Sequence, residues 1–202
     1  MEVIDLDEVL DTGYNKRVRK TKTPPQNNKN KLNEIIRFII SFVVVVAGTL
    51  LFVAYVGQRT QVNGSSMENT LYNKDNLIVD KISYKFTDPK RFDIVVFPHK
   101  GEDGREVYYI KRIIGLPGET VQITKGVIYI NDKALEENYG REEMLEGKLA
   151  ASAVKLGENE YFVLGDNRNH SSDSREIGPV SGDIIIGKAI FRIYPFKRFG
   201  FI

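Results

Sequence analysis

The segment VYYIKRIIGLPGE, residues 107–119, joins a strand to a turn and decides the class of the fold. Residues 107–114 look apolar on both faces apart from one Lys-Arg pair, which is typical of a strand buried on two sides. In the LPGE that follows, Pro117 and Gly118 occupy the two central positions of a type II turn. The segment therefore predicts a β-rich domain.

Further short runs of β-branched and aromatic residues lie on either side of this segment, separated by Gly, Pro, Asp and Asn. They are residues 76–82, 92–98, 120–123, 127–130, 160–164 and 183–194. Residues 133–153 are richer in Ala, Glu, Leu and Lys, which favours a helix or an irregular insertion. The prediction is a mainly β fold, a small β-barrel or sandwich, with a short insertion at 131–157.

An uncharged run of nineteen residues, FIISFVVVVAGTLLFVAYV (38–56), precedes the β-rich part. A helix of this length spans about 28 Å, close to the thickness of the hydrocarbon core of a bilayer. The run is longer than the roughly 7–15 residues of a secretory h-region, and no A-x-A cleavage pattern follows it. A buried core helix would show a polar stripe, which this run lacks. The sequence therefore predicts a transmembrane helix over 35–57.

Basic residues lie mainly before this run, and Arg59 alone follows it closely. The positive-inside rule then predicts a single-pass protein of the plasma membrane with a cytoplasmic N-terminus. Residues 1–34 are basic and polar after an acidic start, which predicts a disordered cytoplasmic tail. Residues 58–202 become the extracytoplasmic domain.

The composition excludes several kinds of chemistry. The 202 residues include no cysteine and two histidines, which excludes thiol catalysis and disulfides and argues against a multi-histidine metal site. We therefore expect no metal and no other cofactor. The net charge of +2 gives no indication of nucleic-acid binding, and none is expected.

Lys111 is an unusual residue within the strand at 107–114. Side chains alternate along a strand, so Lys111 shares a face with Tyr109 and Ile113. Burial among apolar neighbours lowers the pKa of a lysine, and a pKa near about 7–8 allows it to act as a general base. The alternative is a lysine that extends to water from the end of the strand.

The segment VNGSSMENTL, 62–71, contains two adjacent serines, Ser65 and Ser66. A serine hydroxyl becomes a nucleophile only when a base removes its proton. The alternative is a plain surface turn, because Asn, Gly and Ser are common in turns.

The segment GDNRNHSSDSR, 165–175, follows the expected strand at 160–164. Asp173 can pair with Arg175, and Asp166 with Arg168, which would stiffen the loop. A loop held in this way is able to aim a hydroxyl such as that of Ser171.

Three segments in this order, together with the apolar run, resemble the bacterial type I signal peptidases. GSSMENT is similar to the nucleophile motif of that family. FDIVVF, followed by YYIKRIIGLPGE, is similar to its strand motif, and GDNRNHSSDSR is similar to its third motif. These proteins are membrane-anchored serine proteases with a Ser/Lys dyad that remove signal peptides from exported proteins. The resemblance covers most of residues 38–195, and the single span resembles the shorter enzymes of Gram-positive bacteria.

The resemblance implies Ser66 as the nucleophile and Lys111 as the general base. It further implies cleavage of exported preproteins at small-x-small sites, at the lipid bilayer and beside the secretion translocase. The supporting and orienting residues that it implies are Ser171 for the lysine, the pair Asp173 and Arg175, Asp166 in the third motif and Gly64 near the oxyanion hole.

Two departures from the family pattern matter. Asn69 stands where the family usually has proline, which removes a fixed φ from the turn after the nucleophile. Gly64 stands where some members carry a serine that helps to form the oxyanion hole. Ser66 lies only ten positions after Val56, at most roughly 35 Å along the chain, so we expect the nucleophile near the outer membrane face.

Two other hypotheses follow from the same residues. A catalytically degenerate, membrane-tethered homologue would bind exported proteins without cleaving them, and Asn69 is the residue that favours it. A Ser-His-Asp hydrolase would instead use His170, which lies in the chain between Asp166 and Asp173.

Overall fold

The structure is a computed structural model that describes residues 28–101 and 104–202. Most of the tail expected over 1–34 lies outside the described residues. The chain forms two units, one up to Val45 and one from Val46 to Ile202. The first unit contains most of the helix α1, Asn28–Val56. The segment Lys31–Thr49 of this helix is long and apolar enough to cross a membrane, and the side chains of the segment are exposed.

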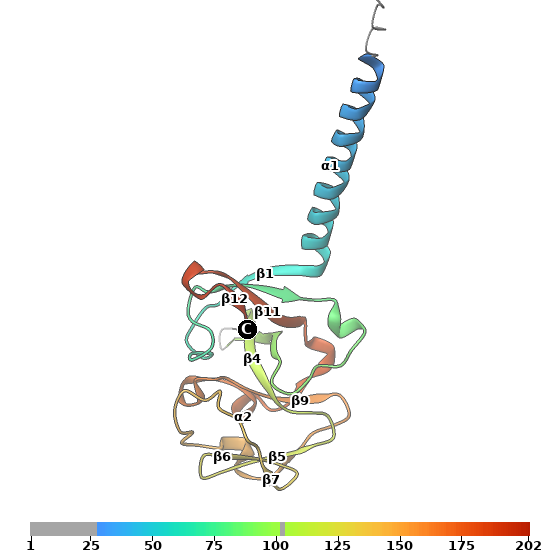
Figure 1. The fold of residues 1–202 in the computed structure, drawn as a ribbon. Helices are drawn as coiled ribbons and strands as arrows, with labels where there is room; N and C mark the ends of the chain where they lie inside the picture. Colours follow the sequence, from blue (N-terminus) through green and yellow to red (C-terminus); the bar gives the residue numbers. More distant parts are fainter. Residues whose placement is uncertain (1–27, 102–103) are drawn as a thin grey trace, which may run out of the picture. The chain divides into compact units, whose positions relative to one another are not determined.

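Two antiparallel sheets build the second unit, in agreement with the mainly β fold expected from the sequence (Figure 1). The larger sheet has the strand order β1-β2-β11-β3-β4-β9-β10, and β12 pairs with β11. Its strands are β1 (Gly57–Gln61), β2 (Asn76–Asp80), β3 (Ile94–Lys100), β4 (Glu106–Gly115), β9 (Glu160–Leu164), β10 (Val180–Ser181), β11 (Gly187–Tyr194) and β12 (Gly200–Phe201).

The smaller sheet has the order β7-β6-β5-β8, and its two short strands β7 and β8 belong to the insertion. Its strands are β5 (Thr120–Thr124), β6 (Val127–Ile130), β7 (Lys133–Ala134) and β8 (Val154–Lys155). Short helices connect the strands: η2 (Ser83–Lys85), η3 (Lys148–Ala151), η4 (Arg168–His170), α2 (Ser174–Ile177), η5 (Gly182–Ile184) and η6 (Phe196–Arg198). Apolar side chains from the smaller sheet pack with Ile114, Phe162 and Leu164 in one core cluster.

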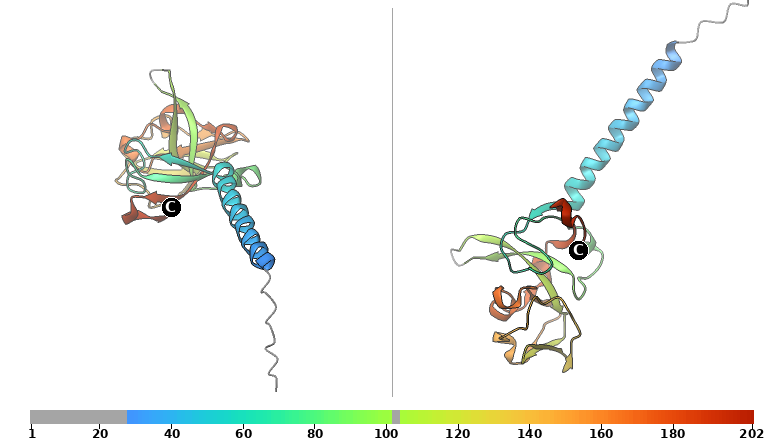
Figure 2. Two further views of the ribbon diagram at one scale, coloured as in Figure 1. Left: turned by 90° about the horizontal axis from the view of Figure 1, so that it is seen from above. Right: turned by 60° about the vertical axis from the view of Figure 1, so that its left-hand side comes forward.

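The strand β4 is central to the unit. It pairs with β3 along Glu106–Arg112 and with β9 from Arg112 onward, and its residues from Ile110 to Gly115 are buried. Figure 2 shows the β3–β4 hairpin projecting beyond the other strands. The turn after β4 has the predicted type II character, because Gly118 has φ +76° and the Glu119 N–H donates to the Leu116 oxygen at 3.1 Å.

Among the differences from the expected elements is the additional strand β1. β1 was not predicted because its sequence, GQRTQ, is polar; pairing with β2 rather than apolar burial forms this strand. Residues 133–153 contain only the short strand β7 and the short helix η3, so of the two expected alternatives the irregular insertion is the one that forms. Their backbone groups bind other parts of the chain: the Arg141 N–H donates to the Asp166 backbone oxygen, and the Leu145 N–H donates to Asn169 Oδ1.

Candidate active site

Ser66 lies at the start of a tight turn that connects β1 to β2. Backbone hydrogen bonds from Glu68 N to Ser65 O (3.1 Å) and from Leu71 N to Met67 O (2.8 Å) close this turn. Met67 and Leu71 are 1% and 0% exposed, so their side chains anchor the turn in a core cluster beneath it. The half-buried Ser66 is therefore held on a fixed backbone.

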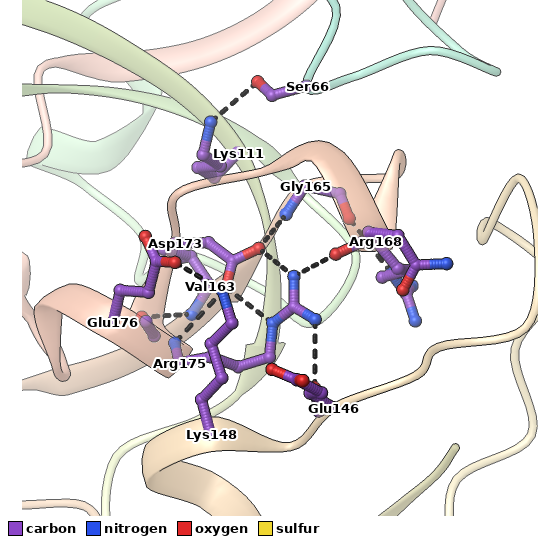
Figure 3. A network of polar contacts seen from close by, with 12 residues as sticks. Ser66, Lys111, Glu146, Lys148, Val163, Gly165, Arg168, Asp173, Arg175 and Glu176 are labelled. Atoms are coloured by element: carbon purple, nitrogen blue, oxygen red, sulfur yellow. Dashed lines mark hydrogen bonds and ion pairs between the residues drawn. The ribbon is translucent and has the colours of Figure 1, made fainter.

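Lys111 reaches the same place from β4 (Figure 3). Its Nζ is 2.8 Å from Ser66 Oγ and forms a hydrogen bond with it. The side chain is 3% exposed, and the amine lies 4.9 Å from the centre of the Tyr109 ring. Burial lowers the pKa of Lys111 to about 8, against the opposing effect of the Asp173 and Asp166 carboxylates. A large neutral fraction is therefore present slightly above neutral pH.

Asp173 and Arg175 form the buried ion pair that the sequence predicted, with Asp173 Oδ1 and Arg175 Nε 2.8 Å apart. The same carboxylate accepts hydrogen bonds from the Gly165 and Arg175 N–H groups, and the Arg175 guanidinium donates to the Arg168 and Glu146 backbone oxygens. Figure 3 shows this network beneath Lys111. It fixes both ends of the 165–175 loop.

Asp166 joins the loop to β4 and to the nucleophile turn. Its carboxylate accepts hydrogen bonds from Arg112 Nε at 2.9 Å and Nη2 at 2.7 Å, and from Thr70 Oγ1 at 2.5 Å. The expected pairing of Asp166 with Arg168 is not formed. Arg168 faces the insertion and binds both oxygens of Glu137, at 2.6 Å and 2.8 Å.

Ser171 lies beside the backbone of the nucleophile. A Cβ atom added to Gly165 would be 2.2 Å from Ser171 Oγ and 2.5 Å from the Ser66 backbone oxygen, so only glycine allows this close packing. That backbone oxygen accepts a hydrogen bond from the Asn167 N–H at 3.0 Å. Within the described part of the chain, the buried Ser171 hydroxyl has no hydrogen-bond partner, Lys111 included. The hydrogen bond to Lys111 that an orienting serine would make is therefore not formed in this structure.

A cleft of about 620 Å³ opens over Ser66 and Lys111. Its wall combines residues from β1, the nucleophile turn, β4 and the 165–175 loop. The lining residues are Thr60, Gln61, Val62, Asn63, Gly64, Ser65, Ser66, Met67, Val107, Tyr108, Tyr109, Ile110, Lys111, His170 and Ser172. The site therefore has room for a peptide above the Ser-Lys pair.

The alternative Ser-His-Asp arrangement is not assembled. His170 lines the cleft, but the two carboxylates that would orient it are bound to arginines: Asp166 to Arg112 and Asp173 to Arg175. Among residues 28–101 and 104–202, no group of three His, Asp or Glu side chains is arranged to hold a metal ion.

Sequence reasoning missed three residues of this arrangement: Arg112, Thr70 and Asn167. Arg112 carried a signal, because a second charge in a strand buried on both faces requires a partner. Thr70 and Asn167 are ordinary polar residues in polar segments, and their partners lie far away in the sequence.

Comparison with known proteins gives a consistent result. The family described as "Signal peptidase, peptidase S26" matches residues 32–194. The chain is 42% identical to signal peptidase I of Leptolyngbya laminosa, over 84% of this chain and 83% of that protein. It is 36% identical to signal peptidase I T of Bacillus subtilis, over 89% and 95% of the two chains. A crystal structure of a signal peptidase I from Enterococcus faecalis has 37% identity and a TM-score of 0.41, over 50% of this chain and 97% of that one.

Proposed function

The chain belongs to the signal peptidase family, peptidase S26, whose members are serine endopeptidases that cleave signal peptides from preproteins. On this premise we propose that Ser66 is the nucleophile of the chain and Lys111 its general base. The observation that supports these roles is the 2.8 Å contact between Ser66 Oγ and the buried amine of Lys111. When Lys111 is protonated, its Nζ donates the hydrogen bond to Ser66 Oγ. When Lys111 is neutral, the Ser66 hydroxyl donates the hydrogen bond to Nζ.

In the proposed reaction, neutral Lys111 accepts the Ser66 proton while Oγ attacks the scissile carbonyl carbon. The tetrahedral intermediate collapses when its C–N bond breaks, and the Lys111 ammonium gives the proton to the leaving amine. Water then attacks the acyl-enzyme with Lys111 again as the base, which releases the signal peptide and regenerates Ser66. The buried ion pair of Asp173 and Arg175 supports the loop beneath the lysine.

The Ser66 backbone N–H is the proposed oxyanion donor. Among the described residues it donates to no other group, whereas the Gly64 N–H is already bound to Asn73 Oδ1 at 3.2 Å. Gly64 has φ +98° and no side chain, so it contributes shape rather than a hydroxyl. A preorganised N–H of this kind stabilises the charge that develops on the carbonyl oxygen.

The substrate is proposed to bind as an extended peptide at a small-x-small site of an exported preprotein. Two strand edges that line the cleft support this. Among the described strands, β1 pairs only with β2, and the first half of β4 has a partner only on its β3 side. Open strand edges recognise extended peptides through backbone hydrogen bonds. The apolar lining residues Val62, Met67 and Ile110 suit small aliphatic side chains.

We further propose that residues 35–57 span the plasma membrane, with the tail 1–34 in the cytoplasm and residues 58–202 outside. The charge distribution around the span supports this orientation, since Lys and Arg are concentrated before it. The exposed apolar side chains between Lys31 and Thr49 suit contact with a lipid bilayer. In this position the enzyme would act beside the secretion translocase.

The pH dependence of cleavage tests the role of Lys111. Because the amine must be neutral to accept a proton, kcat/KM is expected to rise about tenfold per pH unit below the pKa of about 8, and to level off above it. The measurement is cleavage of a preprotein with an Ala-x-Ala site in detergent–lipid micelles from pH 6 to 10. A profile that is flat over this range would exclude a buried lysine base.

Gly165→Ala is expected to lower kcat/KM by about 100-fold, because a displacement of about 1 Å in a catalytic group has this cost. The new methyl group would displace Ser171 or the Ser66 backbone, both within 2.5 Å of its position. Gly140→Ala is the matched control, since its added Cβ would be 3.5 Å or more from its neighbours. Equal kcat/KM values in the two variants, with thermal unfolding measured in parallel, would contradict the tight packing at Gly165.

A further inference from the structure

His170 lines the cleft and is exposed, and it ends the short turn η4. The other two side chains of this turn are fixed on the insertion. Arg168 binds the Glu137 carboxylate at 2.6 Å and 2.8 Å, and Asn169 donates to the Glu143 backbone oxygen at 2.9 Å. Because both neighbours are anchored, η4 presents the imidazole of His170 to the cleft from a rigid support.

Backbone packing places His170 at the Ser66 end of the cleft. Ser171 Oγ and the Ser66 backbone oxygen both press against Gly165, within 2.5 Å of where its Cβ would lie. Ser171 is therefore beside the nucleophile, and His170 precedes it with a Cα–Cα separation of about 3.8 Å. His170 therefore lines the cleft on a segment that packs directly against the backbone of the nucleophile.

The ionisable acid–base side chains of the cleft wall are basic, apart from its tyrosines. No carboxylate is among its lining residues, and the basic side chains there are Lys111 and His170. Lys111 is buried and bonded to Ser66, which leaves His170 as the basic group that a substrate side chain meets at the surface. An imidazole donates hydrogen bonds and carries a positive charge when protonated, so it favours a carboxylate and disfavours a cation.

We propose that His170 is a specificity-determining residue that selects preproteins with an acidic side chain next to the scissile bond. The inference rests on the proposed function. Small residues are expected at the first and third positions before the cut, so the acidic side chain is accommodated at the second position before the cut or at the first two positions after it.

The test is a set of preproteins with an Ala-x-Ala site that carry Asp, Asn or Lys at each of these three positions in turn. The measured quantity is the ratio of kcat/KM for the Asp and Asn substrates, with the full chain in detergent–lipid micelles at pH 6, because the charge contact requires the protonated imidazole. For at least one position, wild type is expected to favour Asp over Asn by about three- to fivefold, as for a solvent-exposed charge contact. The ratio is expected to fall to about one in His170→Asn, and His170→Glu is expected to favour Lys.

Lys133→Gln is the matched control, because it removes a positive charge from the exposed strand β7 of the smaller sheet. It is expected to keep the wild-type ratio. Suppose that wild type cleaves the Asn substrates. An Asp-to-Asn ratio that is then the same in wild type, His170→Asn and His170→Glu at all three positions would overturn the inference. Failure of wild type to cleave any Asn substrate would instead overturn the proposed function, and the inference with it.

Discussion

Lys111→Arg is expected to lower kcat by a factor of about 10⁴ or more, because a guanidinium stays protonated and cannot accept the Ser66 proton. Arginine resembles the protonated form of the lysine at every pH, so the substitution keeps a cation at this position and removes the neutral form that acts as the base. The longer, planar group must also fit a position that is 3% exposed. Single-turnover cleavage of a preprotein with an Ala-x-Ala site measures the loss.

Lys188→Arg is the matched control for this variant. Lys188 lies on β11 and forms an ion pair with Asp93, with 2.6 Å between Nζ and Oδ1, which arginine is able to preserve. This control is expected to cleave at the wild-type rate. Turnover by Lys111→Arg within tenfold of wild type, in a folded protein, would remove Lys111 from the mechanism.

Ser66→Ala is expected to abolish cleavage, with a fall in kcat of about 10⁵- to 10⁶-fold, as for loss of the nucleophile in other serine proteases. The hydroxyl makes its hydrogen bond with Lys111 at 2.8 Å, so its removal leaves the amine and the turn in place without a nucleophile. The same single-turnover assay measures this variant. Its folding is checked by thermal unfolding, which should change little.

Ser152→Ala provides the matched control, because this serine is exposed and lies in the insertion at the end of η3. It is expected to behave as wild type. If Ser66→Ala still cleaved the preprotein, the nucleophile would have to be another group. If wild type failed to cleave several such substrates, the catalytically degenerate homologue considered from the sequence would become the better explanation.

The strands that carry Lys111 and the 165–175 loop were predictable because their apolar residues follow a pattern that burial imposes locally. β6 and β9 match their expected ranges, 127–130 and 160–164. The strand expected over 183–194 begins only at Gly187, because Ser181 caps the turn η5 in front of it. β1 depends on pairing with β2, and a polar pentapeptide gives no local sign of such pairing.

The partners of the charged loop residues were predictable only where they are close in the sequence. Asp173 and Arg175 are two residues apart and do pair. Asp166 binds Arg112, 54 positions away, although Arg168 is much nearer along the chain. Sequence spacing identifies groups that need a partner, whereas the tertiary fold decides which partner is in reach.

The departure at Asn69 can now be interpreted through its neighbours. Asn69 itself is exposed, but Glu68 binds Arg141 with 2.8 Å between Oε2 and Nη1, and Thr70 binds Asp166 at 2.5 Å. The turn after the nucleophile is therefore held on both sides of the position where the family usually has proline. These contacts provide rigidity that the missing pyrrolidine ring would otherwise supply.

The burial of Lys111 also has a thermodynamic consequence for the whole domain. The pKa of its amine is about 8 in the folded state against 10.5 for the ordinary side chain, so between these two pH values unfolding takes up a proton. Stability then rises with pH across this window, by roughly 3 kcal/mol for a shift of this size, and the full penalty applies below pH 8. Loss of the proton that makes Lys111 a base therefore also removes its destabilising contribution to the fold, so catalysis and the stability contribution of this residue both improve as the pH rises through 8.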